Sequence, residues 1–250
     1  MNLIDPFAEI DCLKSRLGTL CPLPEYTVRT LHEQQILGWI YHSNAIEGNT
    51  LTEKETNVVL EGVTIGGKPL REHFEVINYK KAINYVEALV HAKALLSELH
   101  IKSIHHFILK NIDDRNAGQY RHENIVVAGA EHVPPHFLNV PEAMASLIEK
   151  YGAEEHLHPV ECAARLHADF IGIHPFVDGN GHTARLLMNF ELIRRGFLPA
   201  IIPVWQRLEY YDALDTAHTC GEYTLFIELV AGLEQTALAR YLRIIQGSPN

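Results

Sequence analysis

The chain has 250 residues, of which 47% are hydrophobic and 21% charged, the composition of an ordinary globular protein with one or two domains. Its 31 acidic residues outnumber its 21 lysines and arginines, which gives a formal net charge of −10. This balance excludes a nucleic-acid coat protein, because binding a phosphate backbone requires a basic surface. A local pocket for a small phosphate ligand stays compatible with it.

Cysteine usage and hydropathy predict a cytoplasmic protein. No two cysteines have C-x-x-C spacing, and we expect all four to be reduced: Cys12, Cys21, Cys162 and Cys220. The first ten residues include Asp5 and Glu9 and lack the basic region of a signal peptide. The sequence has no run of about 18 apolar residues, the length that a membrane-spanning helix needs.

The chain begins with a predicted arm, residues 1–24, followed by a helical region, residues 25–95. A long helical pattern covers residues 26–46, after two prolines. A further helix is predicted to begin after Thr52, because Thr52 and Glu55 have the spacing of a capping box.

Residues 96–245 form the predicted core of the chain and also show helical periodicity. One apolar stripe consists of isoleucines spaced three or four residues apart: Ile101, Ile104, Ile108 and Ile112. Another helix follows Pro159, since proline suits a first helical turn. The run from Ala184 to Ile193 is apolar on nearly every side, which predicts a central helix surrounded by others and ended by Gly196.

One segment departs from the helical pattern and is predicted to be a β-hairpin. Residues 122–133 carry β-branched side chains around a glycine turn and precede two prolines. The residues expected to form the hairpin are Val126, Val127, Gly129 and Val133. A lone hairpin is marginally stable, so we expect it to pack on helices or to receive a partner strand. The predicted fold class is mainly α, with one β-hairpin.

Candidate chemistry gathers in residues 174–185, directly before the predicted central helix. Residues 179–181 are Gly-Asn-Gly, and glycines allow backbone N–H groups to converge on an anion at a helix N-terminus. Asp178 is a candidate Mg²⁺ ligand, His174 a candidate base and Arg185 a candidate phosphate clamp. The alternative is an ordinary helix-entry turn with Asp-Gly and Asn-Gly chemistry.

The sequence HPFVDGNGHTAR in this segment resembles the Fic-domain motif, H-P-F-x-(D/E)-G-N-G-R-x-x-R. Residues 118–135, from GQYR through the predicted hairpin to Pro-Pro, are similar to the family's flap. Ser43–Asn49 resembles its inhibitory motif, (S/T)-x-x-x-E-(G/N). The resemblance runs from about residue 25 to residue 245. It implies a Fic-fold helical bundle with one β-hairpin flap, an N-terminal inhibitory helix and a catalytic core at residues 96–245.

The resemblance also implies a protein adenylyltransferase, which moves AMP from ATP to a Ser, Thr or Tyr hydroxyl of a protein with Mg²⁺ as cofactor. His174 matches the general base, Asp178 the Mg²⁺ ligand and Arg185 the arginine that holds the γ-phosphate. Phe176 matches the aromatic anchor of the loop. The α-phosphate cradle matches Gly179, Asn180 and Gly181. The flap would receive the target peptide as an added strand.

The inhibitory segment carries the implied regulation. Ser43 and Glu47 are four residues apart and share a helix face, and Gly48 suits the end of that helix. By resemblance, Glu47 reaches Arg185 and takes the place of the γ-phosphate, which keeps the enzyme mostly off. Two alternatives stay open: an ordinary glutamate near a helix end, or a glutamate that aims water to remove AMP from a modified protein.

The chain departs from the family pattern at two places. His182 replaces the first motif arginine at the nucleotide site, and histidine, mostly neutral at pH 7, is a weaker phosphate clamp. The outcome could be a weak transferase, a de-AMPylating phosphodiesterase, use of another nucleotide, or nucleotide binding without turnover. Tyr211 matches the adenine pocket, whereas His218 stands where relatives have asparagine.

The remaining histidines show no metal-site signature, because the chain has neither an H-E-x-x-H motif nor a His-Asp dipeptide. We interpret them, His105 and His106 included, as surface or packing residues. The expected partners are ATP, a protein target that can be the chain itself, and a second copy in a homodimer. Nucleic acid and membranes are not expected partners.

Overall fold

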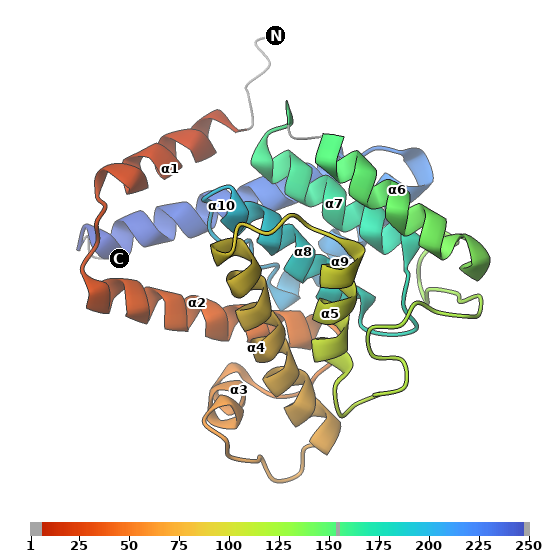
Figure 1. Cartoon of the computed structure of the whole chain (residues 1–250). Coiled ribbons are helices and arrows are strands. Elements are labelled where there is room, and N and C mark those ends of the chain that lie inside the picture. The colour runs from red at the N-terminus through yellow and green to blue at the C-terminus, as the bar shows by residue number, and fades with distance from the viewer. Residues whose placement is uncertain (1–6, 154–155, 248–250) are drawn as a thin grey trace.

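A computed structural model describes residues 7–153 and 156–247 of the chain and shows a mainly helical fold, as predicted (Figure 1). Residues 1–6 of the predicted arm lie outside the described residues, and residues 8–19 of it form α1. The helices are α1 (Ala8–Thr19), α2 (Glu25–Ile46), α3 (Glu53–Leu60), α4 (Leu70–His91), α5 (Glu98–Leu109), η1 (Phe137–Asn139), α6 (Val140–Ala153), α7 (Pro159–Ile173), α8 (Asn180–Arg194), η3 (Val204–Gln206), α9 (Arg207–Cys220) and α10 (Thr224–Ile245).

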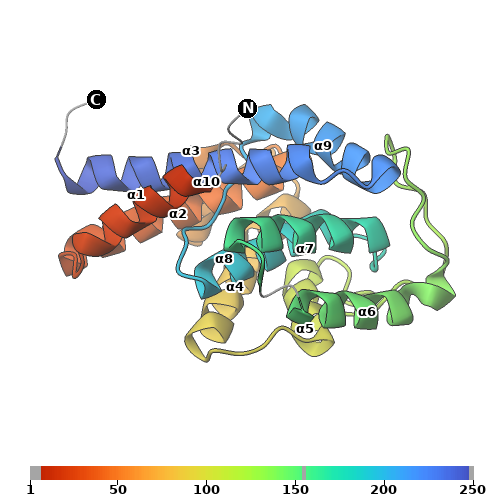
Figure 2. The same ribbon diagram turned by 90° about the horizontal axis from the view of Figure 1, so that it is seen from above.

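Helix α8 is the centre of the fold, as its apolar sequence predicts. It packs against α7, α4, α5 and α2, and side chains such as Leu187 and Phe190 are fully buried. Figure 2 shows α7 and α8 between α10 on one side and α5 and α6 on the other. Gly196, with φ +76°, follows the end of α8. The loop that begins α8 is therefore attached to the most rigidly enclosed element of the chain.

Local sequence signals explain where other helices begin and which faces they bury. Thr52 and Glu55 form the predicted capping box at the start of α3, with both reciprocal hydrogen bonds present. On α5, Ile101 and Ile104 of the predicted stripe are completely buried. Pro159 occupies the first turn of α7.

The predicted β-hairpin is wrong, since no strand is present among the described residues, which include the whole flap. Val126 and Val133 are 89% and 75% exposed, and Gly129 forms a turn with φ +82°. Two strands without a third strand or a covering helix gain little from pairing. The base of the flap is held by a side chain instead: Arg121 Nη1 donates to the Glu123 carbonyl at 3.0 Å, and Nη2 donates to the Pro135 carbonyl at 2.5 Å.

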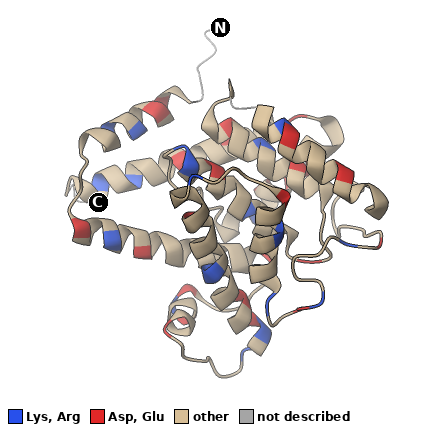
Figure 3. Cartoon of the chain, in the orientation of Figure 1, with Lys and Arg blue, Asp and Glu red and all other residues tan. Residues whose placement is uncertain are grey.

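Acidic and basic side chains are interspersed along the visible helices (Figure 3). None of the described helices combines the length and hydropathy required to cross a lipid bilayer.

Candidate active site

The loop between α7 and α8 begins with a histidine in a strained conformation. His174 follows the last residue of α7 with φ 48° and ψ 60°, in the left-handed region that residues other than glycine rarely adopt. Arg121 holds this turn, because its Nε donates to the His174 carbonyl and its backbone N–H donates to the Pro175 carbonyl, both at 2.9 Å. Such strain persists only where surrounding contacts impose it, and it clusters at functional sites.

Asn180, the first residue of α8, braces the loop from inside. Its Nδ2 donates to the Phe176 carbonyl at 2.9 Å, and its Oδ1 accepts the Phe176 N–H at 3.0 Å. Phe176 itself is fully buried, as expected of an anchor. The Asn180 side chain is therefore committed to the loop. Its backbone N–H, in the first turn of the helix, is what it can offer to an anion.

His105, on α5, contacts the same loop, a role that we did not predict from the sequence. Its ring is fully buried and stacks on Phe176 with centroids 3.6 Å apart. The Gly118 N–H donates to Nδ1 at 2.9 Å, so Nε2 carries the proton and donates to the Asp178 carbonyl at 2.9 Å. Burial lowers the pKa of His105 to about 4. The spacing of residues in the sequence cannot distinguish His105 from a histidine that only packs, because both its hydrogen-bond partners are backbone groups of distant segments.

Asp178 presents its carboxylate at the edge of the loop. The side chain is 55% exposed, and it accepts hydrogen bonds of 2.8 Å from Arg71 Nη2 and from the Gly179 N–H. Among residues 7–153 and 156–247, no three His, Cys, Asp or Glu side chains gather into a metal site. One accessible carboxylate still fits Mg²⁺, which proteins commonly hold through one or two carboxylates together with substrate phosphates.

Arg185 reaches from α8 to the end of α2 and is only 3% exposed. Its Nε donates to Ser43 Oγ at 2.8 Å, and its Nη2 donates to the Ser43 carbonyl at 3.1 Å and to Glu47 Oε1 at 2.8 Å. Ser43 and Glu47 were predicted to share a helix face, and Arg185 belongs to the loop motif. The structure brings these three residues into contact. Arg185 Nη1 is buried and makes no hydrogen bond, so the guanidinium retains a donor for a further ligand.

The end of α2 aims Glu47 at this site. Gly48 adopts φ +97°, and the N–H groups of Gly48 and Asn49 donate to the carbonyls of Ala45 and Asn44, each at 3.1 Å, which is the Schellman pattern. Gly48 therefore ends α2, as predicted.

The Glu47 carboxylate lies at the start of α8, beside Gly181 and Arg185. A Cβ at Gly181 would overlap Glu47 Oε1, so the glycine is what allows this approach. Burial opposes ionisation of Glu47, but Arg185, with help from His182 and Arg207, outweighs it and lowers the pKa of the carboxyl. Glu47 is therefore an anion at neutral pH, held by Arg185 close to the N-terminus of α8.

His182 lies one turn into α8 and is 8% exposed. Its Nε2 is 3.1 Å from Asn44 Oδ1, and its ring meets the edge of Tyr79 with centroids 5.2 Å apart. Burial and the neighbouring Arg185 lower the pKa of His182 to about 4. His182 is thus neutral at pH 7 and hydrogen-bonded to Asn44 on α2.

His174 is also neutral at pH 7. Burial, and to a smaller extent Arg121, lower its pKa to about 4, against the opposing effect of the Ile171 carbonyl. Its Nδ1 is buried and makes no hydrogen bond. A neutral imidazole of this kind can accept a proton from a hydroxyl group.

The two residues predicted near the adenine pocket lie on α9. The Tyr211 hydroxyl accepts a hydrogen bond from Arg207 Nε at 3.4 Å. His218 Nε2 donates to the Ala168 carbonyl at 2.7 Å, and its ring lies 4.9 Å from that of His132 in the flap. His218 therefore connects α9 to α7 and contacts the flap.

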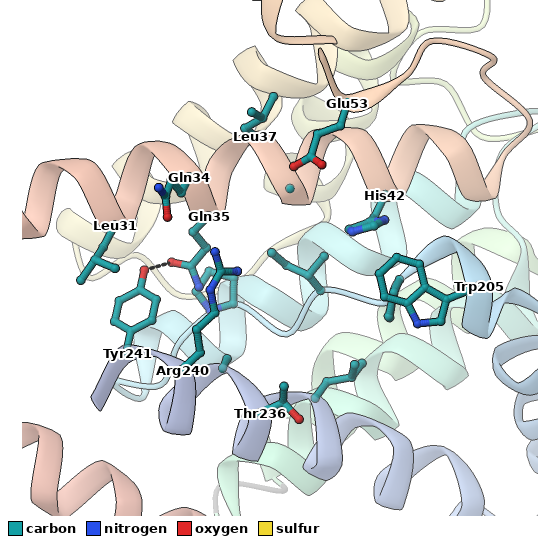
Figure 4. A pocket seen from close by; sticks show the side chains of 16 residues that line it. Leu31, Gln34, Gln35, Leu37, His42, Glu53, Trp205, Thr236, Arg240 and Tyr241 are labelled. Atoms are coloured by element: carbon teal, nitrogen blue, oxygen red, sulfur yellow. Dashed lines mark hydrogen bonds between the residues drawn. The ribbon is translucent and has the colours of Figure 1, made fainter. Parts of the chain in front are cut away.

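A cavity of about 90 Å³ lies beside the loop between α7 and α8 and is lined in part by Glu47, Arg71, Asp178 and His182. A separate cavity of about 440 Å³ lies between α2 and α10, where His42, Trp205, Arg240 and Tyr241 line it (Figure 4). It includes none of the predicted site residues, and we assign it no role.

Comparisons with known proteins agree with this geometry. The Fic/DOC family model matches residues 95–192. Protein adenylyltransferase Fic of Drosophila virilis is 39% identical over 210 residues, which cover 81% of this chain and 42% of that protein. The chain spans about half the length, or less, of the curated relatives it matches.

Two solved structures are similar over almost the whole chain. A Fic domain-containing signalling protein from Bacteroides thetaiotaomicron has a TM-score of 0.88 and 29% identity, covering 97% of this chain and 100% of that one. Fic-1 from C. elegans has a TM-score of 0.87 and 30% identity, covering 98% of this chain and 74% of that one. With the family model matched over residues 95–192 and a solved Fic structure 30% identical over 98% of this chain, the chain belongs to the Fic/DOC family.

Proposed function

We propose that the chain is a protein adenylyltransferase held in an inhibited state by Glu47. The observation that carries this proposal is the Glu47 carboxylate, bound at 2.8 Å by the buried Arg185 and seated against Gly181. A site that accepts a carboxylate in this way has the charge and the donors to accept a phosphate group. The curated relatives named protein adenylyltransferase support AMP as the transferred group.

In the proposed reaction, a target hydroxyl attacks the α-phosphorus of ATP and gives its proton to His174. The new bond joins the hydroxyl oxygen to phosphorus, and the bond from phosphorus to the pyrophosphate oxygen breaks. Backbone N–H groups of residues 179–181 stabilise charge on the α-phosphate, in the manner of an oxyanion hole. Arg185, once free of Glu47, holds the γ-phosphate and pyrophosphate leaving group.

Asp178 is the residue that would hold Mg²⁺, in exchange for its contact with Arg71. Bound Mg²⁺ supplies positive charge that offsets the charge developing on the phosphates. The exposed position of Asp178 allows this exchange without rearrangement of the buried loop.

The flap is proposed to dock the target. Val126, Val127, Gly129 and Val133 lie in an exposed segment without a strand partner among the described residues. Backbone groups of this kind are available to an extended peptide, which would supply the second strand itself.

Removal of AMP is a second candidate function, favoured by the environment of Glu47. Its side chain keeps 36% of its surface accessible to solvent while its charge acts on His174. A carboxylate in contact with both water and the site could orient a water molecule for attack on an AMP-protein bond.

The two functions are separated by one experiment with three proteins. Wild type, Glu47→Gly and His174→Ala would each be incubated with Mg²⁺ and α-phosphate-labelled ATP, with and without an AMP-modified target. The proposal expects label transfer to rise in Glu47→Gly and to vanish in His174→Ala. Loss of AMP removal in Glu47→Gly, without any gain in transfer, would favour the hydrolase instead.

A further inference from the structure

Asn44 lies on α2, next to Ser43 in the sequence, and its buried side chain contacts His182. It is 2% exposed, and its Nδ2 donates to the Ile40 carbonyl at 2.8 Å. That bond fixes the orientation of the amide, because only the nitrogen can donate. The oxygen is therefore the atom that lies 3.1 Å from His182 Nε2.

The orientation of the Asn44 amide defines which ring nitrogen of the neutral His182 carries the proton. An amide oxygen only accepts, so Nε2 of His182 must carry the proton and donate it. Among the described residues this is the one side-chain hydrogen bond of His182, and the imidazole has no second N–H while it stays neutral. The groups whose charges act on it are Arg185 on α8, Glu47 at the end of α2, Asp178 in the loop and Arg71 on α4.

We propose that Asn44 is a positioning residue for His182: it holds the imidazole N–H in the inhibited state, and the N–H becomes available to a nucleotide phosphate when this contact breaks. This inference rests on the proposed function and adds a second contact to its inhibition. Arg185 is held through Ser43 and Glu47, and His182 is held through Asn44. The same end of α2 thus accepts hydrogen bonds from both side chains.

The test compares transfer rates in a double-mutant cycle. The proteins are wild type, Asn44→Leu, Glu47→Gly and the double variant, all assayed with Mg²⁺ and ATP. A net hydrogen-bond contribution predicts a gain of about 2- to 10-fold for Asn44→Leu in the wild-type background. A gain of the same size is expected in the Glu47→Gly background, because Asn44 contacts His182 directly and this contact does not involve the Glu47 side chain.

Asn78→Leu is the matched control. Asn78 is a fully buried asparagine on α4 that donates to the carbonyls of Ile108 and Lys110 and not to His182. It should lower stability without raising the transfer rate. An equal gain in Asn78→Leu, or no gain from Asn44→Leu in either background, would overturn the proposal.

A spectroscopic measurement tests the contact independently of activity. In a ¹⁵N-labelled protein, long-range proton–nitrogen correlations should show His182 protonated at Nε2, and Asn44→Leu should give a mixture of tautomers. Protonation at Nδ1 in wild type, or an unchanged spectrum in Asn44→Leu, would refute the pairing. Absence of transfer in Glu47→Gly with the expected spectra would instead refute the proposed function and leave the pairing supported.

Discussion

Glu47 and Arg185, 138 residues apart in sequence, form an ion pair of 2.8 Å at the N-terminus of the central helix. The arginine is 3% exposed, whereas the glutamate side chain is 36% exposed. This asymmetry means that Glu47 can leave into solvent while Arg185 stays in place. The proposed inhibition therefore requires movement of the exposed partner, Glu47, and not of Arg185.

The first prediction concerns the pH dependence of transfer. Because burial lowers the pKa of His174 to about 4, the base is already neutral at pH 6. In Glu47→Gly, kcat/KM should therefore stay level as pH falls from about 8 to 6, rather than drop near the ordinary histidine value of about 6.5. Initial rates over this range would check it, and a decline centred near pH 6.5 would contradict it.

The second prediction concerns His182→Arg. A guanidinium at this position would add a permanent charge and bidentate donors for phosphate. In the Glu47→Gly background, KM for ATP should fall by about 10-fold, within the range expected for a charge-assisted hydrogen bond. His182→Gln, which keeps a neutral donor, should leave KM within about twofold. Equal KM values for the arginine and glutamine variants would show that the site does not use the charge.

The third prediction concerns His105→Phe, which keeps the ring against Phe176 but removes both hydrogen bonds. The Gly118 N–H and the Asp178 carbonyl would lose their partner, at a cost of about 1–3 kcal/mol each. The pKa of His105 is lowered to about 4 in the folded protein and is about 6.5 unfolded. Its neutral form therefore stabilises the fold fully above pH 6.5, and this contribution is lost as pH falls toward 4.

The difference in unfolding free energy between wild type and His105→Phe should accordingly be largest near pH 7 and shrink by about pH 4.5. Denaturant titrations at both pH values would measure it. A difference that is independent of pH would mean that protonation of His105 is not coupled to folding.

The sequence predicted those parts of the molecule that depend on local patterns. The apolar surface of residues 184–193 predicted a central helix, and the capping box at Thr52 predicted the start of α3. The spacing of Ser43 and Glu47 predicted a shared helix face, and both contact Arg185.

The remaining features depend on contacts between distant segments, which local patterns do not encode. Val126 and Val133 have strand propensity, but no neighbouring strand among the described residues pairs with them. His105 acts through two backbone groups, and His182 is paired with Asn44, 138 residues away. His105 could not be distinguished from a packing residue, and Asn44 could not be identified as the partner of His182, until the helices were placed side by side.

The most direct test of inhibition by Glu47 is the rate at which Glu47→Gly becomes AMP-modified, followed by intact mass with Mg²⁺ and a mixture of nucleotides. Glu61→Gly is the matched control, because Glu61 also follows a helix end, precedes a left-handed glycine and is exposed. We predict addition of one or more AMP groups at least about 10-fold faster in Glu47→Gly than in wild type or Glu61→Gly. Equal rates in the three proteins, or no nucleotide addition in any of them, would contradict the account.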